Sequence, residues 1–247
     1  MKTLIDLTDR FPMRIDLERL RSELDLLNNH TWVAHYDKDL ADGWTAVPLV
    51  SWDGSMDRVE SQNIGVWGQY RRTPIVARLP YFSQILDAFQ CPHGRIRIMK
   101  MLPGTIIRPH RDIKEEVSNF AFNQVRLHIP IVTNDKVVFN VDGVNLQLEP
   151  GRLYYVNFSK THYVRNDGSE VRTHLVLDLK VNDFLRNVFP ELTLGERFGN
   201  TLQRRLLPIV WKLQDAKKYP QRKFWKLYEG SRLQKVRHRL RTRSTAA

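Results

Sequence analysis

The chain has 247 residues, of which 42% are hydrophobic and 27% are charged, and its formal net charge is +12. This length suits one large domain or one domain with an appendage, and this hydrophobic fraction excludes a wholly disordered chain. A single cysteine, Cys91, excludes an intrachain disulfide and a zinc site built from several thiolates.

Two features of the chain bear on its location. The first twenty residues lack the apolar run of a secretory signal. The sequence also lacks an uncharged apolar run of about 18 residues, so we expect no transmembrane helix. The low use of cysteine fits a reducing compartment. We therefore expect a cytoplasmic protein, with peripheral association at a membrane left open.

Two segments in the first third of the chain predict helices. In residues 14–28, leucines and an isoleucine recur at helical spacing between charged residues, which is typical of an amphipathic surface helix. Residues 80–90 begin with Pro80, a residue favoured at the first position of a helix.

From Cys91 onward the sequence pattern changes from helical to strand-like, and short segments rich in β-branched and aromatic residues predict strands. These segments are residues 95–102, 124–132, 136–141, 144–149, 152–158 and 171–181. Turn pairs such as Pro103–Gly104 and Asp142–Gly143 separate them. Short strands at such regular intervals indicate a sandwich or a barrel.

After Asn182 the strand pattern stops, and residues 183–190 and 200–215 are expected to be helical. Residues 204–243 contain 14 Lys and Arg but only 2 Asp and Glu, so the rest of the chain carries 25 of each and is neutral. We therefore divide the chain into a domain of residues 1–182 and a basic helical extension of residues 183–247.

Aromatic and aliphatic residues are interleaved with the basic residues of this extension, which leaves three interpretations open. The extension packs its apolar residues on the domain, or it lies on an anionic membrane surface. It could also bind nucleic acid by neutralising phosphates. The chain has no recognised nucleic-acid motif, which disfavours the last interpretation.

His110 and Asp112 stand two residues apart, and in a strand such residues project from the same face. His162 follows the predicted strand of residues 152–158. Two histidines and one carboxylate form the facial triad that holds iron(II) in non-heme oxygenases and leaves positions open for a co-substrate and oxygen. The same residues could instead be a surface histidine beside a solvated aspartate.

Arg172 stands ten residues after His162, beyond a turn at Asn166–Gly168. A hairpin of this length would bring Arg172 back alongside His162, where its planar guanidinium would match the far carboxylate of a dicarboxylic co-substrate. The alternative is an ordinary strand arginine that faces solvent. His174, two residues on, is a rival for the second metal-binding histidine, but no arginine stands ten residues beyond it.

Arg126 and His128 share one face of the predicted strand 124–132, opposite Val125, Leu127 and Ile129. Polar residues on an inward face would line a cavity, whereas on an outward face they would be solvated.

The run from Gly104 to Lys180 resembles the aspartyl/asparaginyl β-hydroxylase family, and also the related bacterial cis-type free-proline hydroxylases. The matching pieces are RPHRD, RLHIPI, PGRLYYVNFSKTHYVRNDG and VRTHLVLDL, and residues 43–54 match more loosely. The resemblance implies a mainly β fold: a double-stranded β-helix (a cupin-like jelly roll) with flanking N-terminal helices. It also implies an Fe(II)-dependent dioxygenase that uses 2-oxoglutarate and O₂.

By this resemblance, His110 and His162 bind the metal and Arg172 pairs with the distal carboxylate of 2-oxoglutarate. Arg126 and His128 then line the side of co-substrate and substrate. The animal aspartyl hydroxylases look like His-x-Gly at the first ligand pair, whereas Asp112 is present here and completes the triad. This departure favours the bacterial small-molecule branch and argues against a halogenase.

The expected reaction is hydroxylation of an unactivated C–H bond in a free, carrier-bound or peptidyl amino acid of the Pro or Asp/Asn type. Two alternatives remain: a hydroxylase of lipid acyl chains that the basic extension recruits to a membrane, and a non-catalytic cupin-like binding protein.

Overall fold

The computed structural model describes residues 2–34, 43–57, 59, 70–112 and 124–191, and beyond these residues 193–195, 198, 201, 202 and 206. The chain divides into two compact units, Met1–Thr201 and Leu202–Ala247. Nearly all described residues belong to the first unit. The domain boundary expected at residue 182 and the role of the basic extension therefore stay predictions, and most of that extension lies outside the described residues.

The described part of the first unit is mainly β. Its helices are η1 (Thr8–Arg10), α1 (Leu17–Asp25), η3 (Pro74–Arg78), α2 (Pro80–Ala88) and α3 (Asp183–Val188), where η marks a 3-10 helix. Its first strands are β1 (Leu4–Asp6), β2 (Val33–Ala34), β3 (Trp44–Ser51), β4 (Arg71–Arg72), β5 (His93–Met101) and β6 (Ile106–His110). The later strands are β7 (Gln124–Val132), β8 (Val137–Val141), β9 (Val144–Leu146), β10 (Tyr154–Val156), β11 (His162–Asn166) and β12 (Arg172–Lys180).

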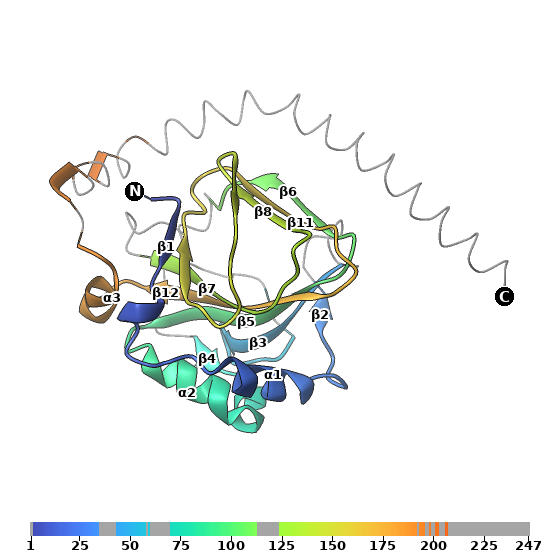
Figure 1. The fold of residues 1–247 in the computed structure, drawn as a ribbon. Coiled ribbons are helices and arrows are strands. Elements are labelled where there is room, and N and C mark those ends of the chain that lie inside the picture. The colour runs from blue at the N-terminus through green and yellow to red at the C-terminus, as the bar shows by residue number, and fades with distance from the viewer. Residues whose placement is uncertain are drawn as a thin grey trace. The chain divides into compact units, whose positions relative to one another are not determined.

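These strands form two antiparallel sheets. The larger sheet has eight strands in the order β1-β10-β7-β12-β5-β3-β2, with β4 paired to β3, and the smaller sheet has four in the order β6-β11-β8-β9. Figure 1 shows α1 and α2 against one face of the larger sheet and the strands β6, β8 and β11 across its opposite face. Two antiparallel sheets packed in this way form the jelly-roll architecture that the resemblance implied, so that prediction is confirmed.

Alternation along the strands gives the larger sheet two different faces. On β12, Leu175, Leu177 and Leu179 are fully buried in the core that the sheet shares with the helices. His174, Val176 and Asp178, at the alternate positions, are also buried but lie outside that core, and His174 reaches Phe139 of the smaller sheet through the ring of His128. One face of the sheet is therefore an apolar core, and the other carries polar chemistry.

The helices are fixed to the larger sheet by capping as well as by burial. Asp16 caps α1 by accepting a hydrogen bond from the Arg19 amide at 3.1 Å. Glu23 of α1 accepts from the amides of Tyr81 and Phe82 in the first turn of α2, at 2.6 and 3.0 Å. A carboxylate at a helix N-terminus satisfies otherwise unpaired amides, so it joins the two helices.

An apolar cluster fills part of the space between the two sheets. Its buried members include Met101 from the larger sheet, Phe139 and Val164 from the smaller sheet, and Phe158 from the segment that joins them. The hairpin of β8 and β9 closes this side with Asp142 and Gly143, whose φ angles of 55° and 86° are those of a type I′ turn. The remaining space between the sheets is lined by charged and polar residues.

Most predicted elements are present, with shifted ends, and several strands were not predicted. Six strands have no counterpart among the strand segments read from the sequence: β1, β2, β3, β4, β6 and β11. In the part of the chain that the structure describes, no helix is long and apolar enough to cross a membrane.

Candidate metal centre

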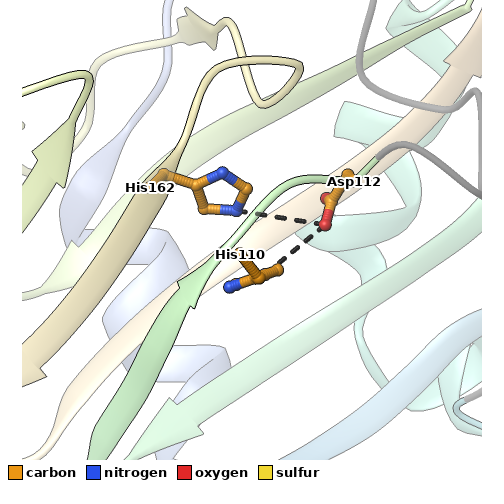
Figure 2. A group of neighbouring side chains, drawn as sticks. All are labelled: His110, Asp112 and His162. Atoms are coloured by element: carbon orange, nitrogen blue, oxygen red, sulfur yellow. Dashed lines mark ion pairs between the residues drawn. The ribbon is translucent and has the colours of Figure 1, made fainter. Parts of the chain in front are cut away.

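The structure brings His110, Asp112 and His162 together. One ligand atom from each lies within 4.8 Å of the other two. The Asp112 Oδ1 atom lies 3.5 Å from His110 Nε2 and 3.9 Å from His162 Nε2, and Figure 2 shows both imidazoles directed toward this carboxylate. The predicted convergence of the three side chains is therefore present in the fold.

The strands of the smaller sheet place the two histidines side by side. His110 is the last residue of β6 and His162 the first of β11, and the two pair across the antiparallel ladder. Their ring centroids are 4.2 Å apart. Asp112 lies beyond the end of β6, where its amide donates to the Phe158 carbonyl at 3.2 Å. The expectation that one strand carries both His110 and Asp112 was wrong, because the strand ends between them.

The backbone orients both imidazoles. His110 Nδ1 lies 2.7 Å from the Arg108 carbonyl, and His162 Nδ1 lies 3.0 Å from the Lys160 carbonyl. A carbonyl can only accept, so each Nδ1 carries a proton, and in the neutral form of each imidazole Nε2 keeps its lone pair. Metal-binding histidines are commonly held in this way. Both Nε2 atoms are thus prepared to donate to a metal ion.

Burial and charge set the protonation of the three groups. Burial opposes ionisation of Asp112, but Arg126 and the two histidines hold the pKa of its carboxyl well below the ordinary value. Burial and the neighbouring His110 lower the pKa of His162 to about 3. Burial would also lower the pKa of His110, but the hydrogen bond and the charge of Asp112 raise it. At neutral pH the cluster offers one carboxylate and at least one neutral imidazole.

A buried ion-pair network supports the carboxylate from behind. Arg126 donates through Nη1 to Asp112 Oδ2, and through Nε to Asp178 Oδ1 at 2.6 Å. Asp178 of β12 also accepts from Arg95 Nε at 3.2 Å and lies 3.8 Å from Arg97 Nη2. Arg126 therefore links the Asp112 carboxylate to a second, fully buried aspartate.

The sequence interpretation missed Asp178, Arg95 and Arg97. The signal was present, because Arg95 and Arg97 alternate with isoleucines on β5 as Arg126 and His128 alternate with apolar residues on β7. The inward orientation inferred for Arg126 and His128 agrees with their burial, since the Arg126 side chain is 12% exposed and His128 is 6% exposed.

Arg172 does not return beside His162 in a hairpin. It opens β12 in the larger sheet, where it pairs with Met101 of β5, whereas β11 belongs to the smaller sheet. The turn after Asn166 carries the chain from one sheet to the other, so the hairpin expectation was wrong. Arg172 is nevertheless buried, 4% exposed, and its guanidinium lies 5.4 Å from the ring centroid of Phe139 in the opposite sheet.

Arg172 has unusual surroundings for a buried arginine. Its guanidinium donates a hydrogen bond to His174 Nδ1 at 2.9 Å. Among the described residues, no carboxylate forms an ion pair with it. Its Nε atom is buried without a hydrogen-bond partner in the same part of the chain. Burial lowers the pKa of Arg172 to about 9, so the side chain still carries its charge at neutral pH. His174, the rival metal ligand, belongs to this group and not to the triad.

The residues present fit iron(II) and a dicarboxylate. Two imidazole nitrogens and one carboxylate oxygen are the donor set of the facial triad. A buried arginine without a carboxylate partner among the described residues suits the far end of a dianion.

Comparisons with known proteins were made for the sequence and for the fold. A family model described as aspartyl/asparaginyl beta-hydroxylase matches residues 14–181. A comparison with curated proteins found no match.

Two solved structures illustrate the similarity in fold. An oxidoreductase of the 2OG-Fe(II) oxygenase family from Burkholderia pseudomallei is 14% identical, with 72% of this chain and 82% of that chain covered and a TM-score of 0.42. A prolyl-4-hydroxylase from Pseudomonas putida is 13% identical, with 73% and 93% covered and a TM-score of 0.42. Because both TM-scores are below 0.5, the assignment rests on the family model and the site. The model spans well over half of the sequence, and the chain belongs to the aspartyl/asparaginyl β-hydroxylase family of iron(II)- and 2-oxoglutarate-dependent oxygenases.

Proposed function

We propose that this oxygenase hydroxylates an unactivated C–H bond of an amino acid that is free, carrier-bound or part of a peptide. The observation that carries the proposal is the combination of two groups between the sheets. His110, Asp112 and His162 gather their ligand atoms within 4.8 Å, and Arg172 is buried with a neutral imidazole as its hydrogen-bond partner. The first group suits a metal and the second suits an anion.

In this proposal, His110, Asp112 and His162 hold iron(II), and Arg172 receives the distal carboxylate of 2-oxoglutarate. When bound, iron(II) and 2-oxoglutarate together supply the activation of O₂ and the oxidative decarboxylation that yields succinate, CO₂ and a hydroxylated product. Arg172 fixes the far end of the co-substrate, which restricts its orientation before reaction. Arg126 holds the Asp112 carboxylate in place from the side away from the histidines.

The surroundings of the triad also control access. The His162 side chain is 4% exposed, whereas that of His110 is 40% exposed. Phe158 packs against the His162 ring, with their centroids 4.6 Å apart. Solvent and substrate therefore approach from the side of His110, while the aromatic side keeps water away from His162.

The charges near the triad favour a small polar substrate over an acyl chain. Arg95, Arg97 and Asp178 lie on the same face of the larger sheet and connect to Asp112 through Arg126. These side chains are buried and pair with one another, so they form a charged wall on one side of the space between the sheets. A charged wall disfavours a hydrocarbon chain, which needs an apolar wall, and favours a small polar compound such as an amino acid.

The test is a screen of amino acids and short Asp-, Asn- or Pro-containing peptides with the full chain, iron(II) and 2-oxoglutarate. We expect one of them to raise succinate release well above the substrate-free rate, and mass spectrometry to find one added oxygen in that compound. If 2-oxoglutarate is consumed equally with and without every amino acid and peptide, but acyl substrates accelerate it, the amino-acid assignment is wrong. Family membership already favours an oxygenase over the cupin-like binding protein.

A further inference from the structure

His174 occupies a position that the metal centre does not explain. It lies on β12 two residues after Arg172 and is 1% exposed. Its Nδ1 atom is 2.9 Å from Arg172 Nη2 and 3.4 Å from His128 Nδ1. The His128 and His174 rings meet nearly edge to face, with centroids 5.6 Å apart. Arg172, His174 and His128 thus form one buried hydrogen-bonded group.

The arginine determines which nitrogen of His174 carries the proton. A guanidinium can only donate, so His174 Nδ1 must be the acceptor and its proton must sit on Nε2. His128 Nδ1 faces the same lone pair, so it carries a proton, and its own Nε2 keeps a lone pair. His128 can therefore accept at Nε2 but cannot donate, and a hydroxyl or a water, but no carboxylate, suits that position.

This arrangement requires both histidines to be neutral. Burial and the charge of Arg172 hold the pKa of His174 well below its ordinary value. Burial and the charges of Arg172 and Arg126 do the same for His128. A protonated His174 would lose its acceptor and face Arg172 with a like charge. Both histidines therefore remain neutral at pH values near 7, while Arg172 keeps its charge.

A neutral acceptor has a consequence that a carboxylate would not have. An aspartate beside Arg172 would orient the guanidinium equally well, but it would also neutralise its charge and compete with an incoming anion. The imidazole orients the guanidinium and leaves its charge in place. The Nε2 proton of His174 is buried without a partner among the described residues, so it remains available as a second donor.

We propose that His174 is a positioning residue, which orients Arg172 through a neutral acceptor so that the guanidinium keeps its full charge for the distal carboxylate of 2-oxoglutarate. This inference rests on the role proposed for Arg172. It explains why a second buried histidine stands in this strand although it takes no part in the triad.

The test measures 2-oxoglutarate binding by calorimetry with the full chain loaded with Mn(II), which avoids turnover. His174→Asn retains an acceptor near the position of Nδ1, so its dissociation constant should stay within about threefold of the wild type. His174→Leu removes the acceptor, and the constant should rise about tenfold. His174→Asp keeps an acceptor but adds a competing charge, and the constant should rise at least about tenfold.

A matched ligand separates positioning from general damage. 2-Oxobutyrate has the same 2-oxo acid end but no distal carboxylate, so its affinity should be unchanged in all three variants. If the variants bound 2-oxobutyrate as weakly as they bind 2-oxoglutarate, the role proposed for His174 would be wrong. Equal 2-oxoglutarate affinity of the wild type and His174→Leu would also overturn that role, but it would leave the proposed function standing. Tighter 2-oxoglutarate binding by His174→Asp would overturn the charge argument. A wild type that binds Mn(II) but no 2-oxoglutarate would refute the proposed function itself.

Discussion

The buried network behind the metal centre makes a quantitative prediction for Asp178→Asn. The Asp178 side chain is 2% exposed and accepts from Arg126 Nε at 2.6 Å and Nη2 at 3.2 Å, and from Arg95 at 3.2 Å. Removing one partner of a buried ion pair costs roughly 3–5 kcal/mol, because the remaining charges stay buried. Since asparagine preserves the volume and one acceptor, we expect a loss of about 3 kcal/mol.

The chain contains a matched control for this substitution. Asp87 also accepts from an arginine at 2.6 Å, but its side chain is 66% exposed and that of Arg72 is 37% exposed. Exposed pairs contribute roughly 0–1 kcal/mol. For a domain of this size about 1 kcal/mol corresponds to roughly 2–4 °C in the melting temperature. Asp178→Asn should therefore melt roughly 6–12 °C lower, and Asp87→Asn no more than about 4 °C lower.

Thermal unfolding followed by circular dichroism gives the first measurement, and Mn(II) titration below the transition gives the second. Arg126 loses one of its two aspartates in Asp178→Asn and holds Asp112 less firmly, so Mn(II) affinity should fall roughly 10–100-fold. Asp87→Asn should leave that affinity unchanged. Equal melting temperatures for the two variants, with unaltered Mn(II) binding in both, would refute the reasoning.

Three further predictions follow from the site and the core. Asp112→Ala should lower 2-oxoglutarate turnover at least about 100-fold, measured as succinate release, because a direct ligand should matter more than its outer-shell support; unchanged turnover would show that the carboxylate is not a ligand. Mn(II) affinity should fall as pH decreases through the raised pKa of His110, by about tenfold per pH unit, because the metal must displace that proton. His162, whose pKa is about 3, is already neutral near pH 7 and adds nothing to the pH dependence of Mn(II) affinity there. A hundredfold fall in Mn(II) affinity per pH unit, which corresponds to the displacement of two protons, would contradict these protonation states. Glu23→Ala should cost about 1–2 kcal/mol, or roughly 2–8 °C, because it frees two amides of α2. The control Glu18→Ala removes a carboxylate from a side chain that is 83% exposed and should change the melting temperature little.

The sequence predicted the elements whose local pattern is strong. β5, β7, β8 and β12 alternate or run apolar, and Pro80 marks the start of α2 as expected. β6 and β11 were not predicted because their apolar pattern is weak: β6 has a single buried position, Ile107, and two of the three buried positions of β11 are the polar residues His162 and Asn166. These strands are stabilised by pairing, of β6 with β11 and of β11 with β8, which is a property of the folded chain.

The candidate site was predicted in its parts but not in its layout. The spacing of His110, Asp112 and His162 indicated a triad, and the fold assembles it. The ten-residue spacing to Arg172 indicated a hairpin, but a turn that changes sheets has the same local sequence as one that does not. Asp178 was not predicted because the sequence does not distinguish a buried aspartate from a solvated one. Its arginine partners, on β5 and β7, come close to it only in the folded chain.

The crossing between β11 and β12 has a consequence for which oxo acids the enzyme accepts. The two histidines of the triad belong to one sheet and Arg172 to the other, so the gap between the sheets sets the distance from the metal ligands to the guanidinium. That gap is held open by aromatic side chains such as Phe139 and Phe158, whose rings stack 5.9 Å apart. If Arg172 receives the distal carboxylate, as proposed, preference among diacids of different carbon number is a property of core packing. Smaller side chains at Phe139 and Phe158 would then change the preferred length while every polar contact stays intact.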